Sequence, residues 1–182
     1  MKSRPSWPTL SDALRRLRQS GGGLTPDRIV AEYRRLYPDY SPRDVFFAAM
    51  TAGGLWKSIV VESERRVAQG GPTYAYCVNW PGGLKAVHAV DLPLVFNDIE
   101  SNALTKRTAG AQTVAELMSD SLVAFARTGN PSTPALPNWP RFNLEQRPTM
   151  IFDLPPRVDS DPRSAERKLF AADDPPGAAA PR

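Results

Sequence analysis

One run of the sequence, Thr73 to Trp80, most constrains how this chain can fold. Its letters, TYAYCVNW, are aromatic or apolar on both alternating faces, which predicts a β-strand that protein covers on both sides, as in a parallel sheet. Pro81, Gly82 and Gly83 end the run and let the chain turn sharply. A strand of this kind needs neighbours on either side, so the sequence predicts an α/β protein.

The only histidine of the chain, His88, lies a few residues beyond this strand. Histidine is the side chain whose ordinary pKa lets it take and give protons near neutral pH. Loops just past the carboxyl end of a strand are where open α/β sheets bind their ligands. A lone histidine without a metal partner is nevertheless more often an ordinary surface or core residue, so its neighbours must decide its role.

Those neighbours resemble a known family. The segment VHAVDLPLVF, residues 87–96, resembles the histidine segment of type B carboxylesterases, the relatives of cholinesterases and lipases on the α/β-hydrolase fold. MSDSLVAFARTGNPSTPALPNWPRF (118–142) and RPTMIFD (147–153) are similar to later segments of that family in the same order, and upstream IVAEYRRLYP and VVESERRVAQGGPTYAYCVNW are similar to bacterial members. The likeness covers about residues 24–153. It implies an incomplete, carboxyl-terminal part of an α/β-hydrolase, with helices packed around two or three strands of a larger sheet.

The resemblance also implies a role for His88, that of the general base in a Ser–acid–His triad of a carboxylic ester hydrolase. An imidazole accepts the proton of the serine hydroxyl, and a carboxylate holds the imidazole in place. In α/β-hydrolases the chain order is nucleophile, acid, histidine, so a carboxyl-terminal part would carry the histidine alone. Asp91 corresponds by resemblance to an acidic residue of the histidine loop and not to the triad acid. We expect Asp91 to cap the turn that begins at Leu92 and Pro93.

The sequence contains no Gly-x-Ser-x-Gly motif, which a hydrolase nucleophile needs for its strained turn. Its serines are predicted to lie in helix caps or on helix surfaces, and Cys77 is predicted to be a small buried hydrophobe. One histidine and one cysteine are too few for a metal site, and the implied reaction needs no cofactor. Without a nucleophile, the chain is expected to be inactive alone.

Gly21 to Gly23 are expected to form a linker, because no strand precedes them and no Lys-Ser or Lys-Thr follows.

Three functions stay open. The chain is either the carboxyl-terminal portion of a truncated or split type B carboxylesterase, or a non-catalytic interaction module of the α/β-hydrolase fold, or an unrelated small-molecule-binding domain whose likeness is accidental. In the first case it would act on small-molecule carboxylic esters only after an amino-terminal portion joined it. The agreement of several segments in order disfavours the third.

Charge and hydropathy indicate which partners to expect. The net charge of +4 is mild and the arginines are spread out, which argues against nucleic acid. No stretch is expected to span a bilayer, and no secretory signal is visible after Met1, so a cytoplasmic location is the default expectation.

A sheet cut from its neighbours has an open edge that promotes association. The chain alone is therefore expected to be poorly soluble or to bind a partner that completes the sheet.

The sequence predicts three segments: a basic one with a short helix and a glycine linker (1–23), the carboxylesterase-like region (24–153), and a proline-rich, largely disordered tail (154–182). Helices are expected to begin at Thr25-Pro26 and at Ser41-Pro42, where a cap residue precedes proline. Gly53 and Gly54 are expected to interrupt the second helix, which resumes over 55–68. A further helix is expected over 113–127, with an apolar face that packs into the core and Gly129 just past its end; the face consists of Val114, Leu117, Met118, Leu122 and Phe125. A short strand is expected over 149–153.

Overall fold

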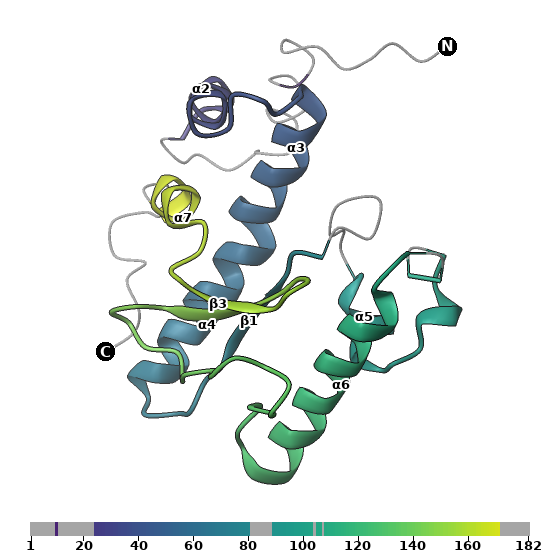
Figure 1. The fold of residues 1–182 in the computed structure, drawn as a ribbon. Helices are drawn as coiled ribbons and strands as arrows, with labels where there is room; N and C mark the ends of the chain where they lie inside the picture. The colour runs from purple at the N-terminus through teal and green to yellow at the C-terminus, as the bar shows by residue number, and fades with distance from the viewer. Residues whose placement is uncertain (1–9, 11–23, 81–88, 104, 107, 172–182) are drawn as a thin grey trace. The chain divides into compact units, whose positions relative to one another are not determined.

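The computed structural model describes Leu10 and residues 24–80, 89–103, 105–106 and 108–171 (Figure 1). The chain divides into two compact units, Met1–Arg65 with Arg163–Arg182, and Arg66–Pro162. In the described residues the first unit is built from helices and the second contains a three-stranded sheet.

Two helices of the first unit, α2 (Pro26–Leu36) and α3 (Pro42–Thr51), begin where the sequence predicts. The Thr25 hydroxyl accepts a hydrogen bond from a backbone N–H of the first turn of α2, at 3.3 Å. At α3, the Ser41 hydroxyl accepts from the Asp44 N–H (3.3 Å) while the Asp44 carboxylate accepts from the Ser41 N–H (3.1 Å), which satisfies two otherwise unpaired donors. The apolar faces of both helices form one core, which includes Ile29, Val30, Tyr33, Val45 and Ala49.

The expected interruption at Gly53 and Gly54 is wrong, because the helix continues through them. A π-helical segment, η1 (Ala52–Trp56), joins α3 to α4 (Lys57–Ala68). A Cβ at Gly53 would lie only 2.6 Å from the ring of Phe170. Close packing of this ring offsets the helix-weakening effect of glycine, which costs about 1 kcal/mol relative to alanine.

The continuous helix Pro42–Ala68 is, among the described helices, the one that is long and apolar enough by length and composition to cross a membrane. The sequence was expected to contain no such stretch. A helix that packs inside a soluble protein meets the same two criteria, so they do not by themselves make it a membrane span.

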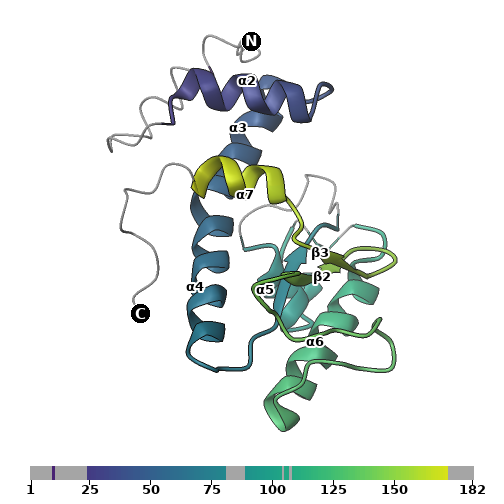
Figure 2. The same ribbon diagram turned by 90° about the vertical axis from the view of Figure 1, so that its left-hand side faces the viewer.

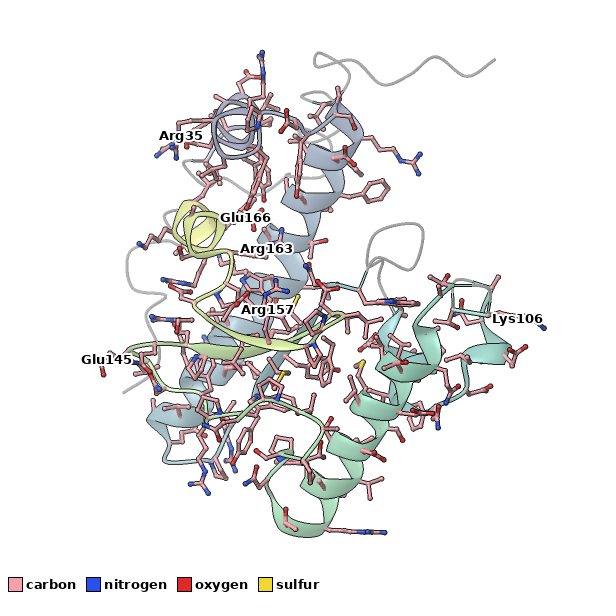
Figure 3. All side chains as sticks on the ribbon, viewed as in Figure 1. Arg35, Lys106, Glu145, Arg157, Arg163 and Glu166 are labelled. Carbon is pink, nitrogen blue, oxygen red and sulfur yellow. The ribbon has the colours of Figure 1, made fainter. Side chains whose placement is uncertain are left out.

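Helix α7 (Ser164–Ala171) belongs to the tail that was expected to be largely disordered. It lies against the long helix in both ribbon views (Figures 1 and 2). Glu166 is buried, and both of its carboxylate oxygens accept hydrogen bonds from Arg163 (labelled in Figure 3). Arg163 also donates to the backbone carbonyl of Ala48 in α3, at 3.2 Å. These charged contacts hold this part of the tail against the helical core.

The sheet of the second unit has the order β1 (Ala75–Val78), β2 (Pro148–Phe152), β3 (Arg157–Ser160). β1 runs parallel to β2, whereas β3 runs antiparallel to it. Every residue of β2 is buried, but Tyr76 of β1 is exposed. The sequence predicted a strand covered on both faces at residues 74–80, whereas the structure gives that environment to β2, the central strand. The predicted α/β arrangement around a small sheet is confirmed.

Three helices accompany the sheet: α5 (Asp91–Val95), η2 (Ile99–Ser101) and α6 (Ala111–Thr128). α6 ends at Gly129, as predicted, because this glycine adopts the left-handed conformation (φ 73°) that closes many helices.

One face of α6 packs against the sheet. The shared core of α6, α5, β2 and the adjoining loops includes Trp80, Leu94, Val114, Ala115, Met118, Met150 and Phe152. Leu122 and Phe125 of α6, both predicted to be buried, are 44% and 43% exposed.

Candidate functional site

The predicted site lies between β1 and α5, at the carboxyl end of β1. His88 and the rest of 81–88 fall outside the described residues, so the role of His88 stays a prediction. The residues directly before and after this segment have defined positions in the fold. The backbone N–H groups of Asn79 and Trp80 both donate to the carbonyl of Phe152 (2.9 and 3.0 Å), and the Trp80 side chain is buried. The described chain continues at Ala89, directly before α5.

A hydrogen bond joins β1 to the start of α5. The Tyr76 hydroxyl donates to Oδ2 of Asp91 at 3.3 Å. Asp91 was expected to cap the turn at Leu92 and Pro93, but the cap residue of α5 is Val90 and no side chain caps it. The structure therefore gives Asp91 a different role, linking the two elements that flank the predicted histidine loop.

This hydrogen bond has a measurable electrostatic effect. Tyr76 is 39% exposed as a whole residue, but its phenol group is partly buried; this partial burial, and then the negative charge of Asp91, raise the pKa of Tyr76 from 10.0 to about 12. Both causes favour the neutral hydroxyl, which is also the form that can donate to Asp91.

We therefore expect Tyr76 to contribute stability that is complete below pH 10 and is lost as the pH rises towards 12. Ultraviolet difference titration of the wild type against Tyr76→Phe should isolate one phenolate that forms with a midpoint near pH 12. Asp91→Asn should lower that midpoint, because it removes a negative charge and weakens the hydrogen bond. A Tyr76 that titrates near pH 10 in the wild type would contradict this arrangement.

The carboxyl ends of β1 and β2 also bring polar groups together. Oδ2 of Asp153, just past β2, lies 3.4 Å from the Asn79 amide and 3.4 Å from the Arg157 guanidinium. Arg157 in turn contacts Asp159 at 3.2 Å. Asp153 thus has a structural explanation as part of a surface ion-pair network.

Other candidates with reactive side chains have local structural roles. Ser41 caps α3 as predicted, and the hydroxyls of Ser58 and Ser121 donate to backbone carbonyls within their own helices. Cys77 was predicted to be buried and is only half-buried, because β1 is at the edge of the sheet formed by the described strands. Within the part of the chain that the structure describes, no three His, Cys, Asp or Glu side chains are grouped so that they could hold a metal ion.

The sequence did not reveal the Tyr76–Asp91 link. The two residues lie fifteen positions apart across the histidine segment, so no helical or strand spacing relates them. The alternation of Tyr74 and Tyr76 in the strand was the only available signal, and it could not indicate which hydroxyl has a carboxylate partner.

Comparison with known proteins gives a consistent family match. A model of the carboxylesterase family matches residues 36–170, which extends past the boundary expected at residue 153 and includes most of α7. The para-nitrobenzyl esterase of Bacillus subtilis (strain 168) is 36% identical over 107 residues, covering 54% of this chain and 22% of that protein. The human cocaine esterase is 34% identical over 78 residues, covering 43% and 14%.

Solved structures show the same similarity. A carboxylesterase of Geobacillus stearothermophilus superposes with a TM-score of 0.76 at 25% identity, covering 91% of this chain and 36% of that one. A PNB esterase gives a TM-score of 0.63 at 28% identity, with coverages of 93% and 34%. The chain thus spans about a fifth of the length of the bacterial curated relative and about a third of these solved structures.

Proposed function

Because this chain belongs to the carboxylesterase family, we propose that His88 is the general base of a serine carboxylesterase. The nucleophile and the triad acid would come from an amino-terminal portion of the family's domain. The observation that carries this proposal is the place of the single histidine, which follows a parallel strand and precedes α5 inside the family match. Small-molecule carboxylic esters are the proposed substrates.

In the proposed reaction, the His88 imidazole accepts the proton of the partner's serine hydroxyl as the oxygen attacks the ester carbonyl. The imidazolium then gives that proton to the departing alkoxide, which leaves an acyl-serine. Water, deprotonated by the same imidazole, then attacks the acyl carbon; the bond to the serine oxygen breaks, the imidazolium returns the proton to that oxygen, and the carboxylic acid leaves. This division of labour agrees with the absence of a Gly-x-Ser-x-Gly motif from the sequence.

The sheet supports the same division. β1 is an edge strand that pairs in parallel with β2, and parallel strands are normally buried within larger sheets. Among the described strands β1 pairs with β2 on one side only, and a further strand of the amino-terminal portion would extend the sheet at its other side. Joining that strand would also bring the carboxyl end of β1, and with it the histidine segment, next to the remaining sheet.

The test is ester hydrolysis by a reconstituted pair. The chain would be mixed with the amino-terminal part of the Bacillus subtilis para-nitrobenzyl esterase that precedes the matching segment, and p-nitrophenyl and para-nitrobenzyl esters would be the substrates. We expect the pair to hydrolyse these esters and the chain alone to be inactive. His88→Ala should lower the rate of the pair by about 10³-fold or more.

Lys85→Ala is the matched control, since it alters a polar residue of the same segment that has no proposed catalytic role. Undiminished hydrolysis by the His88→Ala pair would overturn the proposal. A stable but inactive wild-type pair would also overturn it, and would favour a non-catalytic interaction module instead. Activity of the chain alone that depends on His88 would show that the chain contains its own nucleophile.

A further inference from the structure

The long helix of the first unit has an exposed apolar face. Phe47, Met50, Leu55 and Ile59 are exposed by 54%, 40%, 49% and 44%. Between them on the same side are three small exposed residues. Together these residues form the α3–α4 face: Phe47, Met50, Thr51, Gly54, Leu55, Ser58 and Ile59.

Within residues 45–61 this face has no charged side chain of its own, and at its amino-terminal end the Arg43 guanidinium lies 5.6 Å from the centre of the Phe47 ring. Lys57 is the only charged residue between Val45 and Val61 in the sequence, and its ammonium group donates to the backbone carbonyl of Phe170 on another side of the helix, at 3.2 Å. A mainly apolar surface several turns long, with a charge only at one end, is the kind that marks a protein contact.

The π-helical segment keeps the face straight. Phe47, Thr51, Leu55 and Ile59 recur every fourth residue, and in a regular α-helix each such step turns the side chain by about 40°. Over three steps the row would wind around the helix. In η1 each turn contains more residues, so each residue rotates less and the drift is largely cancelled. This accounts for the exposure of all four positions along one side.

Gly53 and Gly54 are adjacent, but the structure explains the presence of glycine at only one of the two positions. Gly53 is required by the ring of Phe170, which would lie 2.6 Å from an added Cβ. Among the described residues, a Cβ at Gly54 would meet nothing within 4 Å. Packing within the part of the chain that the structure describes therefore gives no reason for glycine at position 54. A partner backbone or side chain that approaches the helix closely would supply one.

A lipid bilayer does not suit the α3–α4 face, because the opposite side of the same helix is already covered by protein. Val45, Ala49 and Ala52 are buried in the core of the first unit, so only one side is available. A helix that crosses a membrane is apolar all round over about 20 residues, whereas this one has a protein-covered side that includes the Lys57 contact.

We propose that the α3–α4 face binds the amino-terminal portion of a carboxylesterase domain. This inference rests on the proposed function, which already requires that portion to supply the serine and the acid. The solved Geobacillus stearothermophilus carboxylesterase contains this chain's fold as 36% of its length, so most of a domain of this family lies outside the matched elements. This remaining part of the domain is large enough to cover the α3–α4 face, and its binding would bury the apolar side chains of the face.

The test measures binding and folding separately. The probe is the same amino-terminal part of the Bacillus subtilis para-nitrobenzyl esterase, titrated by calorimetry with the full chain. Leu55→Glu should weaken binding by about tenfold or more, because it buries a carboxylate in an apolar contact. Leu122→Glu is the matched control: Leu122 is similarly exposed, at 44%, but lies on α6. It should change binding by less than about twofold.

Gly54→Ala provides a second, independent variant. Alanine is the better helix former, and its methyl group would meet no atom of the described residues within 4 Å, so the urea midpoint of the isolated chain should stay the same or rise. Binding should nevertheless weaken severalfold. Equal binding by the wild type and both variants would overturn the inference, as would a wild-type chain that does not bind the probe.

Two other occupants would also overturn it. A wild-type dimer that Leu55→Glu dissociates would assign the face to a second copy of this chain. Partition into phosphatidylcholine vesicles that Leu55→Glu abolishes would assign it to a bilayer. A pair that binds through the face but hydrolyses nothing would defeat the role of His88 alone, whereas His88-dependent hydrolysis with binding insensitive to Leu55→Glu would defeat the docking face alone.

Discussion

Replacing Arg163 by methionine is expected to lower the free energy of unfolding by about 3 kcal/mol, because it leaves a buried carboxylate without its partner. Glu166 is 1% exposed and both of its oxygens accept hydrogen bonds from Arg163. The surroundings have little water: burial, and then the charge of Glu166, raise the pKa of Tyr33 above its ordinary range. The same change also removes the bond from Arg163 to the Ala48 carbonyl, which joins α7 to α3.

Urea unfolding followed by circular dichroism would measure this loss. Arg157→Met is the matched control, since Arg157 is about half exposed and pairs with Asp153 and Asp159 at the surface. Its loss should cost no more than about 1 kcal/mol. The double variant Arg163→Met/Glu166→Met should recover much of the stability, because the uncompensated charge is gone. A loss below 1 kcal/mol for Arg163→Met alone would show that Glu166 is stable without its partner.

Phe152→Ala is expected to cost about 3–5 kcal/mol in the second unit, as do large-to-small changes in well-packed cores. Phe152 is 1% exposed and lies on the central strand β2. Its ring makes edge-on contacts with Tyr76 and Trp139, with both centroid distances at 5.8 Å. Removing the ring would leave a cavity that rigid backbone on both neighbouring strands cannot close.

The fluorescence of the buried Trp80 and Trp139 would report this unfolding transition. Leu144→Ala is the control, because Leu144 is 47% exposed and should lose less than about 1 kcal/mol. If Phe152→Ala and Leu144→Ala have the same urea midpoint, β2 is not the centre of a cooperative core.

Features with a local cause were predictable from the sequence. Thr25 and Ser41 start helices because a side-chain oxygen and a following proline suit a helix terminus whatever the rest of the fold does. Gly129 ends α6 for a similarly local reason. The strand expected over 149–153 lies at Pro148–Phe152, within one residue.

Features that depend on distant residues were not predictable. Gly53 lies inside a helix at a position where the ring of Phe170, far along the chain, occupies the space that a Cβ would take. The order of the tail up to α7 depends on Arg163 and Glu166, which in sequence are simply two charges in a polar stretch. In the candidate site, the position of the histidine segment followed from the strand before it, whereas the partner of Asp91 depended on which side of β1 faces α5.

The pairing of β1 with β2 has a consequence for biosynthesis. Ala75 pairs with Thr149, so β1 leaves the ribosome long before its partner has been translated. The helical unit is completed later still, because α7 follows both strands of this pair in the sequence. Contacts so distant along a chain form slowly, since a long loop must close before any of them is gained. Nascent chains of this protein should therefore keep apolar surface uncovered during synthesis, and we expect their yield to depend on chaperones.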